Sequence, residues 1–153
     1  MSRRQPLVVG IGNSLMADDG AGPYTVSLLE GRLPADQLRV LATPGTTLLS
    51  FIHDRSRVIV VDAARFGGAA GDVRRVAAQD MPRQGTTGSP LSLHDSGVLS
   101  VWDTAVSLDM APQELVFYCV QAAFVGPRET LSPAVEQGCR RAADMIAQEL
   151  SHA

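Results

Sequence analysis

Cysteine is scarce in this sequence of 153 residues, which contains Cys119 and Cys139 and no CxxC spacing. A chain of this length buries about 70% of the surface that its unfolded form exposes, so it needs neither disulfides nor a structural metal to be stable. The small disulfide-stapled scaffolds are therefore excluded. Because both cysteines lie in apolar surroundings, we expect buried, reduced thiols rather than a bridge or a metal-binding pair.

Basic clusters and long apolar runs are scarce as well. Lys and Arg form nothing larger than pairs such as Arg74-Arg75, and 13 basic against 16 acidic residues give a net charge of -3. Nucleic acid is therefore not an expected partner. The longest apolar runs, 58–61 and 115–120, have the length of a strand and not the roughly 20 residues of a membrane-spanning helix. Since the N-terminus also lacks the features of a secretory signal, we expect a cytoplasmic protein that does not bind membranes.

Short apolar strands alternate with amphipathic helices along the chain. Strands are predicted at 7–11, 38–41, 57–62, 72–77 and 115–120, and helices at 21–33, 47–52, 98–106 and 133–150. Because the strongest strands are apolar on both faces, we predict an α/β fold whose mostly parallel sheet, of about five strands, is covered by helices on each side. We expect a single domain over residues 1–153, in which residues 1–6 form a disordered tail.

Candidate chemical groups follow the strands of this predicted sheet. The loops that leave the carboxyl ends of parallel strands form the edge where ligands bind. Asp18 and Asp19 lie in the loop after the first strand, Asp62 ends the third, and His94 precedes the third helix. Two carboxylates and an imidazole at one edge suit a divalent ion or the activation of water.

Each of these side chains also has an ordinary structural explanation. Asp18 and Asp19 suit the cap of the following helix, although one cap needs only one of them. Asp62 fits the start of a loop, and the His94 imidazole could bond a backbone carbonyl. The local pattern does not decide between these interpretations and a functional site.

Gly10 and Gly12 resemble the beginning of a dinucleotide-binding fingerprint. The third glycine of that pattern would fall at position 15, which is Leu15. Asp18 and Asp19 at the following helix would also repel the phosphates that a helix N-terminus attracts. A nucleotide-binding α/β domain is therefore an alternative supported by the two glycines alone.

Four segments in one order resemble the hydrogenase maturation proteases, the endopeptidases that process the large subunit of [NiFe] hydrogenases: GIGNSLMADDGAG, VIVVDAA, LSLHDSG and GPRETLSPAV. The resemblance covers about Leu7 to Leu150 and implies a three-layer α/β/α sandwich. It implies metal-binding and catalytic roles for Asp19, Asp62 and His94. The residues that it implies in support of the site loops are Gly10, Gly12, Asn13, Asp18, Gly20, Gly45 and Thr46.

The activity implied by the resemblance is removal of a C-terminal extension from the large-subunit precursor after nickel insertion. Nickel held by the precursor would serve as the recognition signal, with another divalent metal able to replace it in vitro. An aspartate base and a Lewis-acid metal are both compatible with these residues. A non-catalytic chaperone that inspects the nickel site of the precursor would need the same side chains and stays open as the alternative.

Two positions depart from the pattern of the family. Position 19 is Asp where many members carry Glu, so the carboxylate is withdrawn by about 1.5 Å. Thr43 stands where an acidic residue often precedes the Gly-Thr turn, here Gly45-Thr46. Both departures concern the choice of hydrogenase more than the activity, and Gly45-Thr46 also fits an ordinary turn before a short helix.

Overall fold

The computed structural model describes residues 2–82 and 95–152. Its strands are β1 (Leu7–Ile11), β2 (Leu38–Leu41), β3 (Val58–Ala64), β4 (Val73–Ala77) and β5 (Leu115–Gln121). Its α-helices are α1 (Ala21–Leu29), α2 (Thr46–Ile52), α3 (Asp95–Ser107) and α4 (Pro133–Ser151). Short 3-10 helices lie at η1 (Ala17–Gly20), η2 (Ala35–Gln37) and η3 (Ala78–Asp80).

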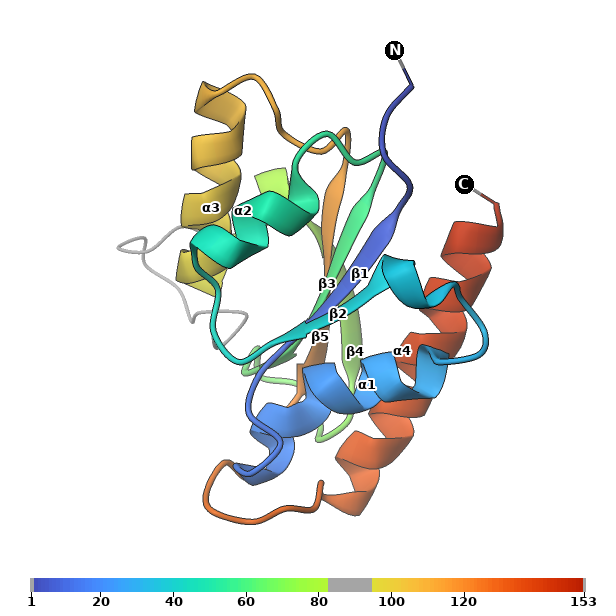
Figure 1. Ribbon diagram of the computed structural model, residues 1–153. Coiled ribbons are helices and arrows are strands. Elements are labelled where there is room, and N and C mark those ends of the chain that lie inside the picture. Colours follow the sequence, from blue (N-terminus) through green and yellow to red (C-terminus); the bar gives the residue numbers. More distant parts are fainter. Residues whose placement is uncertain (1, 83–94, 153) are drawn as a thin grey trace.

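The strands form one sheet in the order β2-β1-β3-β5-β4. β2, β1, β3 and β5 are parallel, and β4 pairs antiparallel with β5 at one edge. Helices α2 and α3 cover one face of the sheet, whereas α1 and α4 cover the other (Figure 1). The predicted fold, a three-layer α/β/α sandwich around a mostly parallel sheet of five strands, is therefore confirmed.

Each face of the sheet has its own apolar core because side chains alternate along the central strands. Val60 of β3 packs among side chains of α2 and α3, and Val61 packs among those of α1 and α4. Asp62, two residues after Val60, belongs to the face that α2 and α3 cover. Cys119 and Cys139 are buried and are not joined in a disulfide, as the sequence predicts.

Helix α1 is shorter than predicted, since it ends at Leu29 and not at residue 33. Glu30 has an extended backbone, and Gly31 has a positive φ of 81°. These conformations are incompatible with a continuing helix. Leu33 nevertheless packs against the same core as Leu29, so the apolar spacing that suggested a longer helix continues into the following turn.

In the segment 1–6, predicted as a disordered tail, Arg4 is bonded to residues that precede β3. The Arg4 backbone N–H donates to the Asp54 carbonyl over 2.9 Å, and the Ser56 N–H donates to the Arg4 carbonyl over 2.9 Å. These bonds hold Arg4 beside the residues that lead into β3. Gln5 is held similarly, because its carbonyl accepts a hydrogen bond from the Arg55 guanidinium.

Helix α4 spans 19 residues and begins, as predicted, with Pro133 in its first turn after Ser132. Its buried side chains include Val135, Cys139 and Ile146, which lie on one apolar face of the predicted amphipathic helix.

Within residues 2–82 and 95–152, no helix has both the length and the apolar character needed to cross a membrane.

The start of α1 lies unusually close to the sheet at Gly22. A Cβ atom on Gly22 would lie 2.5 Å from the backbone oxygens of Ile11 in β1 and Val61 in β3. A Cβ on Gly10 would lie 2.5 Å from the Gly22 carbonyl oxygen. Glycine at both positions therefore lets the loop after β1 reach the carboxyl end of β3.

We predict that Gly22→Ala lowers the free energy of unfolding by about 1–3 kcal/mol, because the added methyl group meets two strand backbones. Gly45→Ala is the matched control, since a Cβ at Gly45 would have open space around it. Urea denaturation of both variants measures the difference. Equal stabilities of the two variants would contradict the close approach at Gly22.

A network of charged groups joins α4 to the sheet at Glu149. Its carboxylate accepts hydrogen bonds from the guanidinium groups of Arg57 and Arg75, each over 2.8 Å, and from the Tyr118 hydroxyl. Burial raises the pKa of Glu149, but the hydrogen bonds from Arg75 and Tyr118 and the two positive charges outweigh it, so this pKa lies below its usual value of 4.5.

A lowered pKa in the folded state means that ionised Glu149 stabilises the fold above about pH 4.5 and that this contribution is lost as the pH falls further. We predict that Glu149→Gln lowers the free energy of unfolding by about 1.5–3 kcal/mol at pH 7. The difference from wild type should shrink between pH 5 and pH 3 in urea denaturation. The exposed Glu30→Gln variant is the control, and a difference independent of pH would contradict this role of Glu149.

Candidate functional site

Asp62 lies inside β3, not at its end as predicted. The strand continues to Ala64 because its pairing with β5 extends to the pair of Ala64 and Gln121. Asp62 is fully buried, at 0% exposure, near the carboxyl end of a central strand. Its interpretation as a residue that starts a loop is therefore wrong, and a carboxylate in this position has no role in terminating the strand.

Asp19 is brought to the end of β1 by a tightly folded loop. One of its carboxylate oxygens accepts a hydrogen bond of 2.8 Å from the Asn13 backbone N–H. Gly12 has a φ of 145°, and a Cβ there would lie 2.0 Å from the Asp19 carbonyl oxygen, so only glycine fits. The Asn13 side chain accepts a hydrogen bond from the Leu15 N–H, which fixes the turn further.

Asp18 has a different environment from its neighbour, because it joins two loops at the carboxyl edge. Its carboxylate accepts hydrogen bonds from the backbone N–H groups of Ala123, Phe124 and Ser132 and from the Ser132 hydroxyl, over 2.7 to 2.9 Å. Burial raises the pKa of Asp18, but these four hydrogen bonds outweigh it, and the pKa lies below its usual value. Figure 1 shows the segment after β5 running beside η1.

The interpretation of Asp18 and Asp19 as helix caps is wrong. Met16 and Gly20 occupy the N-cap positions of η1 and α1, and no side-chain hydrogen bond caps either helix in the described structure. Ser132 stands at the N-cap of α4, but its hydroxyl donates to Asp18 instead of capping the helix.

His94 lies outside the described residues, and its predicted role is untested. Helix α3 begins at Asp95, and a Cβ on its Gly97 would lie 2.4 Å from Cγ of Pro44. Pro44 precedes Gly45, the N-cap residue of α2, and Thr46, the first residue of that helix. The Gly45-Thr46 turn and the first turn of α3 are therefore neighbours on the sheet face to which Asp62 belongs.

Asp19 and Asp62 supply oxygen donors of the kind that suits a divalent ion. Gly22, which contacts β1 and β3 at once, brings the two parts of the chain together. Among the residues that the structure describes, no three His, Cys, Asp or Glu side chains form a group that could hold a metal ion. The third donor that the sequence predicts, His94, lies outside the described residues.

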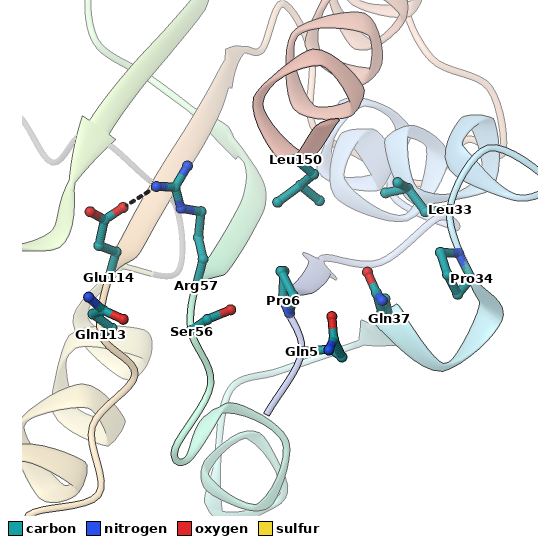
Figure 2. Close-up of a pocket in the computed structure, with 10 residues that line it drawn as sticks. All are labelled: Gln5, Pro6, Leu33, Pro34, Gln37, Ser56, Arg57, Gln113, Glu114 and Leu150. Atoms are coloured by element: carbon teal, nitrogen blue, oxygen red, sulfur yellow. Dashed lines mark ion pairs between the residues drawn. The ribbon is translucent and has the colours of Figure 1, made fainter. Parts of the chain in front are cut away.

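A cavity of about 500 Å³ opens at the opposite, amino edge of the sheet (Figure 2). It is lined by residues that precede the strands, such as Gln5, Ser56 and Gln113. The charge of its Arg57 is paired with Glu114 over 2.6 Å and with Glu149 over 2.8 Å. Asp18, Asp19 and Asp62 do not line this cavity but lie at the carboxyl edge of the sheet.

We predict that Asp18→Asn lowers the free energy of unfolding by about 1–3 kcal/mol, because an amide NH₂ group would face one of the present donors and leave it unsatisfied. Asp36→Asn, at an exposed position in η2, is the control. Urea denaturation gives both values. Equal stability of Asp18→Asn and the control would show that the two loops do not depend on this carboxylate.

Comparison with known proteins finds relatives among the hydrogenase expression/formation proteins. The chain is 31% identical over 146 residues to hydrogenase expression/formation protein HupD of Bradyrhizobium diazoefficiens, covering 88% of this chain and 76% of that protein. It is 32% identical over 150 residues to HoxM of Azotobacter vinelandii, covering 93% and 72%.

The fold is also similar to that of a solved endopeptidase. The hydrogenase maturating endopeptidase HybD from E. coli superposes with a TM-score of 0.81 at 24% identity, covering 97% of this chain and 93% of that one. The family model described as "Hydrogenase maturation protease" matches residues 23–149. This match and the two relatives show that the chain belongs to the hydrogenase maturation protease family, a family of peptidases.

Proposed function

We propose that this protein removes the C-terminal extension of a [NiFe] hydrogenase large-subunit precursor after nickel has been inserted, with the bound nickel as recognition signal. The observation that carries the proposal is the position of two carboxylates, Asp19 and Asp62, at the carboxyl ends of β1 and β3 in a chain of the hydrogenase maturation protease family. We propose the cytoplasm as the place of this reaction.

In this proposal the metal arrives as part of the substrate. Asp19, Asp62 and His94 offer two oxygen donors and one nitrogen donor to an ion already held by the precursor, and this donor set suits a divalent metal. A bound divalent ion acts as a Lewis acid on a nearby carbonyl group. Side chains that complete its coordination also fix the neighbouring scissile peptide bond.

The carboxylates are held in place before the substrate arrives. Asp62 is buried within a strand that is paired on both sides, and the Asn13 N–H holds the carboxylate of Asp19. Such fixed groups lose little conformational freedom on binding. One of them is then available as the base that takes a proton from the attacking water.

A cysteine nucleophile has little support in this structure. Cys119 and Cys139 are both buried. Burial raises the pKa of Cys139 to about 11, so its thiol stays protonated and weakly nucleophilic near pH 7. Water activated by a carboxylate or by the ion is therefore the proposed nucleophile.

We predict that Asp19→Asn, Asp62→Asn and His94→Ala each reduce the processing rate by about 100-fold or more, the range expected when a general base or an ion-binding group is lost. Purified variants are mixed with nickel-loaded precursor, and intact mass spectrometry follows the mature subunit. The exposed Asp36→Asn variant should process normally, and nickel-free precursor should stay uncut by the wild type.

Full conversion by all three variants would overturn the assignment of these residues. If the wild-type protein binds the precursor and releases no peptide, the non-catalytic chaperone replaces the peptidase as the function of this chain.

A further inference from the structure

A pocket of about 250 Å³ lies beside the candidate site, next to η1. Its walls come from the loop after β1, from the first turns of α1 and from the segment 129–131. Pro23, Tyr24 and Leu131 contribute apolar surface to it. The Tyr24 hydroxyl is bonded to Glu136 and Arg140, each over 3.1 Å, so its ring is a fixed wall of the pocket.

Two large apolar side chains are exposed on the loop after β1 and on the segment after β5, and both of these parts of the chain contribute residues to the pocket. Leu15, which follows the lining residue Ser14, is 58% exposed, and Phe124 is 46% exposed. Together with Leu131, a partly buried residue of the pocket wall, we call them the apolar strip. Exposed apolar side chains next to a pocket are typical of a binding site.

The apolar strip is not the result of a loose backbone. The Arg128 N–H donates to the Leu15 carbonyl over 3.1 Å, and the Asp18 N–H donates to the Phe124 carbonyl over 3.0 Å. The Arg128 guanidinium also lies 4.9 Å from the centre of the Phe124 ring. The two segments are therefore bonded to each other, and their apolar side chains are presented to solvent at fixed positions.

The pocket and the candidate site share a single short element. Ala17 and Gly20, which line the pocket, are the first and last residues of η1, and Asp19 lies between them. A polypeptide positioned at Asp19 for cleavage therefore passes within a few residues of the pocket, since an extended chain advances about 3.3 Å per residue. This continuity indicates the substrate itself as the partner of the apolar strip.

We propose that the pocket and the apolar strip bind apolar side chains of the precursor close to its scissile bond, and thereby help to select the substrate. This inference rests on the proposed function. Contacts of this kind bind the substrate and the transition state alike, so their loss raises KM and leaves kcat nearly unchanged.

The test compares Leu15→Asp with Leu108→Asp, because Leu108 is also 58% exposed but belongs to the segment after α3. A second variant, Ser27→Trp, fills the pocket from an exposed position on α1. With nickel-loaded precursor, we expect Leu15→Asp and Ser27→Trp to raise KM at least tenfold with kcat within about twofold of wild type. Leu108→Asp should match the wild type, and thermal unfolding checks that all three variants are folded.

If the wild-type protein cleaves the precursor and Leu15→Asp and Ser27→Trp do so with unchanged KM, the inference is wrong and the proposed function stands. If the wild type cleaves nothing, the proposed function fails. Calorimetric titration with the nickel-loaded precursor then tests the inference, and equal Kd values for wild type and Leu15→Asp would overturn it. Sedimentation tests the remaining outcome. If the wild type is a dimer and Leu15→Asp dissociates it without a change in KM, the apolar strip binds a second copy of the chain and the inference is wrong.

Discussion

The carboxyl edge of this protein depends on one buried carboxylate. The Asp18 carboxylate accepts four hydrogen bonds from the segment after β5, and three of the donors are backbone N–H groups. Such groups are costly to leave without a partner in a buried setting. By satisfying them, Asp18 fixes the loop after β1 against the loop after β5. Asp19, the next residue along the chain, belongs to the loop that this attachment holds.

The glycine-rich opening of the sequence has a steric explanation in the same region. Gly10 and Gly22 allow α1 to approach β1 and β3, and Gly12 makes room for the Asp19 carbonyl. The spacing that resembles a phosphate-binding fingerprint therefore serves close backbone packing here. The loop at the N-terminus of α1 places a carboxylate where a nucleotide-binding domain would have free N–H groups that bind a phosphate.

Features set by local pattern could be predicted from the sequence, and features set by distant partners could not. The amphipathic pattern of 133–150 located α4, and the run at 58–61, which is apolar on both faces, located β3 in a sheet covered by helices on each side. The end of β3 was missed because its pairing with β5 decides it. The resemblance implied that Asp18 supports the site loops, but the local pattern did not reveal its hydrogen bonds, because the donors lie 105 to 114 residues away in the sequence. The sequence held one local signal of that role: a helix cap needs a single aspartate, and two stand here.

We propose that Asp19, Asp62 and His94 surround one divalent ion at the carboxyl edge of the sheet. The most direct test is a crystal of the protein soaked with Ni²⁺ and measured at the nickel absorption edge. We predict an anomalous peak within coordination distance of both carboxylates and the imidazole. A nickel ion bound elsewhere, or coordinates that place the three side chains on separate surfaces, would contradict it.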